Sequence, residues 1–333
     1  MSLTTSKKIS HKVKKFLNLF ALGIATKHRR GAQYDYPKQT LFQPDIYLPG
    51  HVWDSQNPGE RYASVGDLCA HIGDQLPIHL VKRIARDVLR DLANLHGTRG
   101  KAHGDINPDN ILISPRDMKT LISQFYGDGQ SQHTILQSSE MSDAETHLFN
   151  VDTAVVPDSS SAPILFRLCC SEIGRPPRHD PFCDRFGMRP PETLLDAPQS
   201  MSADLWTLGC VLYELITGES LFDPFFQTVE LGLTPEESHL IQIIELLGEF
   251  SCDVVKTGKN WRRWFYNDGS LRLDTTYYPI TLKDILELRI EGAEVPHTAD
   301  LLGSMLRLRP HERAKPADLI NHPWFDNVED EHI

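Results

Sequence analysis

The amino-acid sequence predicts an α+β protein in which helices dominate and strands are short and few. Residues 76–97 repeat apolar side chains at helical spacing, with Arg and Asp on the opposite face; the apolar stripe is Leu80, Ile84, Val88, Leu92 and Leu95. Residues 202–222 are apolar on most faces and contain Gly218 where a buried helix would end. A buried strand is predicted only around residues 162–170, APILFRLCC.

The N-terminal segment differs from the rest in charge. Of 333 residues with a net charge of −11, residues 1–34 hold eight Lys or Arg and no acid, so the remainder carries −11 − 8 = −19. This leader has an apolar stripe at helical spacing, formed by Ile9, Val13, Phe16, Leu17, Phe20 and Ile24. It is read as a mitochondrial presequence or a membrane-surface helix, or else as a frayed terminus. The acidic remainder favours basic protein partners over direct nucleic-acid binding.

Cysteine usage and hydropathy limit the class of protein further. Six cysteines are scattered without a C-x-x-C pair, which predicts a reduced chain in the cytoplasm or nucleus, unless the leader directs it to mitochondria. No run approaches the roughly 18 apolar residues of a transmembrane helix, so none is predicted.

The remaining segments are predicted from composition. Residues 35–75 read as irregular, and Gly97 stands where the first long helix would be capped. Residues 114–162 are rich in Ser, Asp and Gln and predict a long insertion. Six prolines in residues 174–202 predict extended loop, whereas residues 234–325 alternate helical patterns with loops.

The motif that carries chemistry lies in KAHGDINPDNILI, residues 101–113. It has the spacing H-x-D-x-x-x-x-N of a phosphoryl-transfer loop, with His103, Asp105 and Asn110. Asp105 would accept the proton of an attacking hydroxyl, and Asn110 would bind a metal ion. The alternative is a helix-to-loop turn in which Asp and Asn only satisfy backbone groups.

Three downstream features match the conserved spacing of protein kinases. Residues 189–195, RPPETLL, resemble the A-P-E motif, with Glu192 as its acid, and residues 204–209, DLWTLG, resemble D-x-W-S-x-G through Asp204 and Trp206. Arg313 stands where kinases place the partner of that Glu, so a buried Glu192–Arg313 ion pair is expected. Aminoglycoside and choline phosphotransferases share the H-G-D-x-x-x-x-N loop but lack the A-P-E segment and its Arg.

Within the kinases, the chain resembles the SR-protein kinases, especially divergent fungal members. The resemblance spans roughly residues 75–326 and rests also on HLIQIIELLGEF (239–250), WRRWFYNDGSLR (261–272) and LINHPWF (319–325). It implies a protein-kinase-like fold, ATP and Mg²⁺ as cofactors, and Ser of Arg-rich proteins as substrate. The expected organisation is a leader (1–34), an N-lobe remnant and hinge region (35–75), an α-helical C-lobe (76–326) with the insertion 114–162, and an acidic tail (327–333).

Several departures from the kinase pattern bear on activity. No Gly-rich loop or strand Lys precedes the expected hinge at HVWDS (51–55), so the β-rich N-lobe is expected to be reduced or missing. Counting back from A-P-E places Arg167, Leu168 and Cys169 at D-F-G; Arg167 cannot chelate Mg²⁺ but would contact a phosphate. CDRFG (183–187) lies too close to Pro190 to serve. Asn107 replaces the catalytic-loop Lys and brings no charge.

These departures leave three hypotheses for function. The favoured one is a kinase-like protein with impaired or absent catalysis. The second is an active Ser/Thr kinase with an atypical nucleotide site, and the third is a non-catalytic module that binds Arg/Ser-rich partners.

Overall fold

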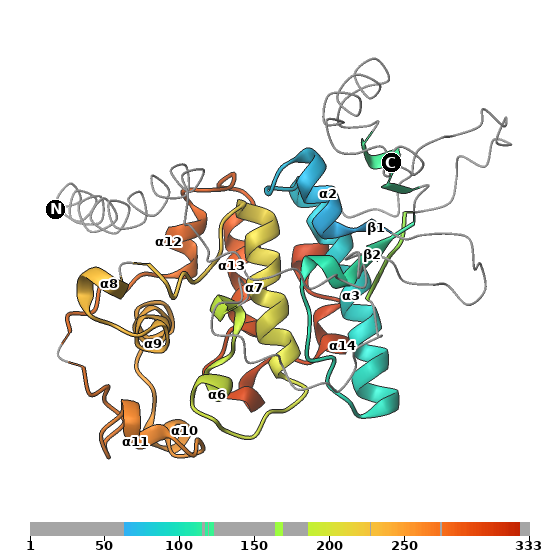
Figure 1. Ribbon diagram of the computed structural model, residues 1–333. Coiled ribbons are helices and arrows are strands. Elements are labelled where there is room, and N and C mark those ends of the chain that lie inside the picture. Colours follow the sequence, from blue (N-terminus) through green and yellow to red (C-terminus); the bar gives the residue numbers. More distant parts are fainter. Residues whose placement is uncertain are drawn as a thin grey trace, which may run out of the picture.

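The computed structural model describes residues 63–114, 117–118, 120–122, 164–168, 186–226, 228–273 and 275–326. Within these residues, helices surround a central helix, α7, and a small sheet lies beside α2 and the upper part of α3 (Figure 1). The prediction of a mainly helical α+β fold is confirmed. The predicted leader, the HVWDS hinge, most of the insertion and the acidic tail lie outside the described residues.

Helix α3, Ile78–Arg99, is the predicted amphipathic helix. Its apolar stripe is buried in the core, from Leu80 to Leu95. The helix continues past the predicted end: Gly97 is helical, and the C-cap is Gly100 at φ 60° and ψ 30°. This left-handed conformation favours glycine, because a Cβ would meet the following carbonyl. The prediction of Gly97 as the cap was therefore wrong by one turn.

Helix α7, Ala203–Thr217, is the predicted buried helix and ends at Gly218. Its residues are buried on most faces, including Leu208, Val211 and Leu215. It packs against α3 on one side and α13, Val295–Met305, on the other. It therefore forms the centre on which the site-bearing segments are arranged.

The sheet has three antiparallel strands in the order β1–β2–β3: Ala63–Ser64, Ile111–Ile113 and Phe166–Leu168. Strand β3, predicted from its apolar run, is an edge strand in the described sheet, and its outer amides need acceptors. Two carboxylates of α3, one turn apart, supply them: Asp87 accepts from Phe166 N at 3.2 Å and Asp91 from Leu168 N at 2.9 Å. Burial raises the pKa of Asp87. Helix α3 thus takes the place of a neighbouring strand.

Helix α2, Val65–Ile72, corrects the prediction that residues 35–75 are irregular. A capping box starts it: Ser64 Oγ accepts from Asp67 N at 2.9 Å, and Asp67 Oδ2 accepts from Ser64 N at 2.7 Å. Val65 and Leu68 bury its apolar side. Ser followed three residues later by an acid was the signal in the sequence.

The described part of the proline-rich segment also contains short helices. Residues Phe186–Met188 form a 3₁₀ turn and Pro191–Leu194 form α6, so extended loop was wrong there. Proline is compatible with the first turn of a helix, where its missing N–H has no partner to lose. Phe186, of the rejected CDRFG run, is buried against Phe225 and His239.

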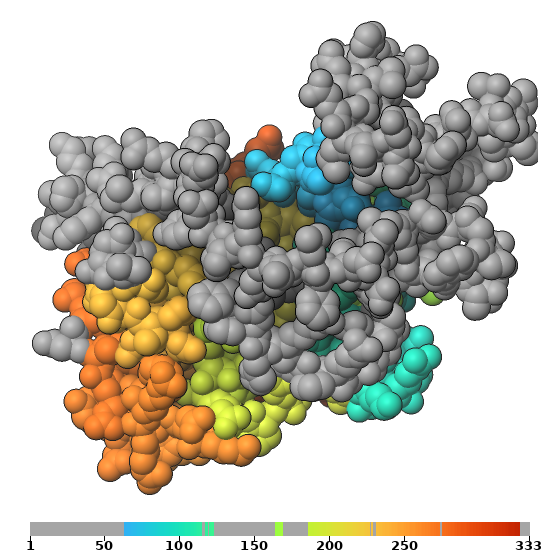
Figure 2. Space-filling model, viewed as in Figure 1, coloured from blue at the N-terminus to red at the C-terminus, as the bar shows by residue number. Residues whose placement is uncertain are grey.

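The C-terminal part alternates helices and loops as predicted. Besides α13 it contains α8 (Thr228–Leu231), α9 (Pro235–Leu247), α10 (Cys252–Val255), α11 (Trp261–Trp264), α12 (Leu282–Leu286) and α14 (Pro316–Leu319), with 3₁₀ turns at Pro310–Glu312 and Pro323–Phe325. In Figure 2, the surface of residues 228–273 lies to one side of the α6 segment and the end of α3 to the other. Among the described helices, none has the length and apolarity needed to span a membrane.

Candidate functional site

The predicted catalytic loop connects α3 to β2 and folds around Asn107. The side chain of Asn107 caps a 3₁₀ turn, Pro108–Asn110, by accepting from Asp109 N at 3.0 Å and Asn110 N at 3.2 Å. Pro108 follows at the first position of the turn, where proline loses no hydrogen bond. The sequence Asn-Pro-Asp-Asn therefore has a local reason to adopt this shape.

Two amides hold Asp105 from the same turn. Asn107 Nδ2 donates to Asp105 Oδ1 at 3.1 Å and to its carbonyl at 2.9 Å. Asn110 Nδ2 donates to Asp105 Oδ2 at 2.9 Å and to the same carbonyl at 2.8 Å. The structure thus brings together the predicted base, the predicted metal ligand and the residue that replaces Lys. Each carboxylate oxygen is fixed by one amide donor.

Asn107 stands in the place of the catalytic-loop Lys, and in the structure it also stabilises the shape of the loop. Only 1 % of the residue is exposed, and both its amide nitrogen and its amide oxygen are engaged within the loop. An amide in this place orients Asp105, but it supplies no positive charge to a phosphoryl group.

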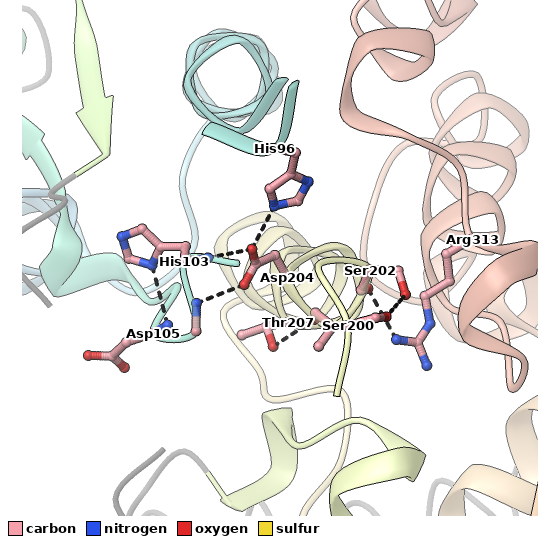
Figure 3. Close-up of polar contacts among 10 residues, drawn as sticks. His96, His103, Asp105, Ser200, Ser202, Asp204, Thr207 and Arg313 are labelled. Carbon is pink, nitrogen blue, oxygen red and sulfur yellow. Dashed lines mark hydrogen bonds and ion pairs between the residues drawn. The ribbon is translucent and has the colours of Figure 1, made fainter. Parts of the chain in front are cut away.

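Asp204, at the start of α7, anchors the loop backbone (Figure 3). Its Oδ2 accepts from His103 N at 2.7 Å and its Oδ1 accepts from Gly104 N at 2.9 Å. His96, in the last turns of α3, lies 2.7 Å from Oδ2 through Nε2. Gly104 has φ 83°, a conformation that favours glycine, so the H-G-D spelling agrees with the backbone.

His103 completes this arrangement from the buried side. It is 1 % exposed, and its Nδ1 accepts from Asp105 N at 3.3 Å. Sequence reasoning included His103 and Asp204 but missed His96. The available signal was a histidine near the buried side of the last helical turn, directly before the loop.

Glu192 of α6 and Arg313 form a buried, two-bonded ion pair. The two guanidinium nitrogens lie 2.6 and 2.7 Å from the carboxylate oxygens, and the Arg313 side chain is fully buried. Arg313 also donates to the carbonyls of Arg307 and Ser202, and it stacks over the Trp206 ring at 5.2 Å. This ion pair joins α6 to the C-terminal segment, although its two residues lie 121 positions apart in the sequence.

Arg167 lies on β3, outside the catalytic loop. It is opposite Leu112, two residues beyond Asn110, and its side chain is 70 % exposed. Among the described residues its ion-pair partner is Asp91 of α3, at 3.5 Å. Cys169, the last residue of the predicted D-F-G place, lies outside the described residues.

The sequence of the chain is similar to that of known protein kinases. Residues 169–325 match the protein kinase domain. Serine/threonine-protein kinase SKY1 of Saccharomyces cerevisiae is 37 % identical over 142 residues, which are 42 % of this chain and 19 % of that protein. Serine/threonine-protein kinase SRPK of Physarum polycephalum is 26 % identical over 270 residues, 76 % of this chain and 62 % of that protein. SRSF protein kinase 3 of Mus musculus is 29 % identical over 137 residues, 40 % and 24 % of the two chains. The chain therefore spans less than two thirds of the length of these relatives.

Proposed function

Because the chain belongs to the SR-protein-kinase-like Ser/Thr protein kinase family, we propose that it is a kinase-like protein whose catalytic loop is preserved and whose phosphoryl transfer is weak. The loop is held by fold contacts that do not depend on nucleotide: Asp204 binds the backbone, and two amides bind Asp105. Retention of this shape is thus compatible with reduced chemistry.

The observation that carries the proposal is the position of Asn107. Phosphoryl transfer depends mainly on positioning and on stabilising the charge of the transferred group. Asn107 occupies the kinase Lys position, is buried, and uses its amide to cap a turn and to hold Asp105. Its place in the loop therefore supplies no cation, and a base without that cation accelerates transfer little.

The residues of the loop fit part of a Mg²⁺–ATP site. Mg²⁺ is usually held by one or two carboxylates together with substrate phosphates. The amide nitrogen of Asn110 donates a hydrogen bond to Asp105, so the amide oxygen of Asn110 is the atom able to bind a metal ion. Asn110 would hold the ion when ATP supplies the phosphates, with Asp105 beside it as the base. No cluster of three or more His, Cys, Asp or Glu suited to a metal occurs in the described part of the chain.

An active Ser/Thr kinase with an atypical nucleotide site is the second candidate. The preserved contact between Asp105 and Asn110 favours it, since these are the two loop residues with direct roles in chemistry. Arg167 would then contact a phosphate, and to do so it would have to leave Asp91. That surface ion pair is weak, so little energy opposes the change.

Arg/Ser-rich proteins are the proposed partners under all three hypotheses: a kinase with weak activity, an active kinase and a module that only binds them. The chain has a net charge of −11, which favours basic segments. The name of the mouse relative refers to SRSF proteins, which extends the same proposal to this chain.

Thermal unfolding with ATP and Mg²⁺ tests the nucleotide site. Weak nucleotide binding predicts little rise in the unfolding temperature of the full chain at millimolar ATP, because stabilisation requires ligand well above its dissociation constant. A clear rise that Asn110→Ala abolishes would support the active kinase instead. Asn94→Ala, an exposed asparagine of α3, is the matched control.

Phosphorylation of an Arg/Ser-rich peptide tests the chemistry. We expect a low rate in the native chain and a higher rate in Asn107→Lys, provided that circular dichroism shows both folded. A native rate typical of protein kinases, lost in Asp105→Asn, would contradict the proposal. Peptide binding without transfer would favour the non-catalytic module.

A further inference from the structure

A cavity of about 890 Å³ borders α3 and the segments that surround α6. Its walls come from the last turns of α3, the segment 195–205, α10 and the segment 308–317. In Figure 1, α6, α10 and the end of α3 occupy the lower part of the view, whereas the sheet that follows the catalytic loop is at the upper right. Asp105, Asn107 and Asn110 do not line it. Its size falls within the range of small-molecule sites, roughly 300–1,000 Å³.

The cavity is lined mostly by small and apolar side chains. Ala93 and Gly97, one turn apart on α3, form one wall, and Val254 of α10 and Leu308 also line the cavity. A Cβ added to Gly97 would meet no atom within 4 Å, so this wall is open because its residues are small. Such a lining favours a flexible apolar chain over a polar ligand.

The charged residues of the lining are not all paired with one another. The lining residues include two acids and three cations, a net charge of 3 − 2 = +1 on a chain of −11. Both acids are already paired: Glu192 with Arg313 and Asp253 with Arg309 at 3.1 Å. Lys315 is exposed and forms no ion pair with any described residue. It is thus the lining cation available for an anion.

We propose that this cavity binds a long-chain carboxylate, a free fatty acid, with the chain among the apolar residues and the carboxylate at Lys315. An uncharged lipid would leave Lys315 without a counter-ion, and a cationic amphiphile would meet its repulsion. A charge-assisted contact between an ammonium and a carboxylate is stronger than a neutral hydrogen bond. The site therefore distinguishes amphiphiles by the charge of the head group.

The ligand would touch side chains that also hold the catalytic loop and the core. His96 lines the cavity and contacts Asp204, and Arg313 lines it and pairs with Glu192. The proposal nevertheless rests on the cavity alone and does not require phosphoryl transfer.

Calorimetric titration of the full chain with dodecanoate, below its micelle concentration, tests binding. We expect saturable binding at one site, retained in Gly97→Ala and lost in Gly97→Leu. Both variants replace a helical glycine by a better helix former, but only leucine extends into the cavity. Thermal unfolding checks that both variants fold. No binding to the native chain, or equal binding to Gly97→Leu, would overturn the proposal.

A second comparison tests the role of charge. Lys315→Ala should weaken dodecanoate binding roughly tenfold, and dodecan-1-ol should bind the native chain similarly weakly. Lys315 makes no side-chain cap on α14, so its removal leaves the fold intact. Lys283→Ala removes an exposed lysine outside the cavity and should leave affinity unchanged. If dodecan-1-ol binds as tightly as dodecanoate, or Lys315→Ala has no effect, the carboxylate assignment is wrong.

Discussion

Removal of the buried guanidinium of Arg313 should be among the most destabilising single changes in the described core. In Arg313→Met, a side chain of comparable length replaces a group that is fully buried. The substitution leaves Glu192, which is 5 % exposed, as a carboxylate without its partner. It also leaves the carbonyls of Arg307 and Ser202 without these donors.

The magnitude follows from these contacts. Two short charge-assisted bonds, at 2.6 and 2.7 Å, compensate the burial of both charges. Breaking a buried pair on one side typically costs about 3–5 kcal/mol, because the remaining charge is not solvated. Because the total free energy of unfolding of a domain is about 5–15 kcal/mol, we expect Arg313→Met to lose a large fraction of its stability.

Urea unfolding followed by circular dichroism measures this loss. The double variant Glu192→Leu with Arg313→Met removes both charges and should recover part of the loss, because an apolar replacement of a buried pair is often tolerated. The four proteins form a double-mutant cycle that isolates the coupling between the two residues. A loss below about 1 kcal/mol in Arg313→Met, or a double variant as unstable as the sum of the single ones, would refute this account.

Three further predictions concern single residues. Burial, with a smaller effect from Arg189, lowers the pKa of His239 to about 3, whereas in the unfolded chain this histidine binds a proton near pH 6.5. The contribution of His239 to the free energy of unfolding is therefore complete above pH 6.5 and falls by up to about 1.4 kcal/mol per pH unit below it. In urea unfolding, the loss of stability between pH 7 and pH 5 should be smaller in His239→Leu than in the native chain. Asn107→Ala removes a cap and an amide donor to Asp105 and should cost about 1–2 kcal/mol in the same assay, whereas no loss would contradict the capping role. Gly100→Ala, at φ 60°, should destabilise by about 1 kcal/mol, whereas Gly97→Ala should be neutral or stabilising; the reverse order in thermal unfolding would restore Gly97 as the cap.

Much of the fold was predictable because its long helices have strong local patterns. The stripe of α3 and the apolar run of α7 predict their own burial, and both helices form where expected. The short elements were missed for a different reason. Helix α2 has only eight residues and α6 only four, so periodicity does not identify them; the capping box marks the start of α2, and the proline at its first position marks that of α6.

The candidate site divides in the same way. The sequence alone determined which residues belong to the loop, since the spacing of His103, Asp105 and Asn110 is local. It also showed that Asn107 brings no charge. The cap that Asn107 provides could have been read from the proline that follows it.

Only the tertiary structure decided what holds these residues in place. Asp204 lies about a hundred positions from the backbone amides that it binds, and Asp87 and Asp91 serve a strand more than seventy residues away. A carboxylate on a helix carries no mark in the sequence of the distant amide that it will accept from. Such pairings arise when folding brings unpaired backbone groups into the interior, where each must find a partner.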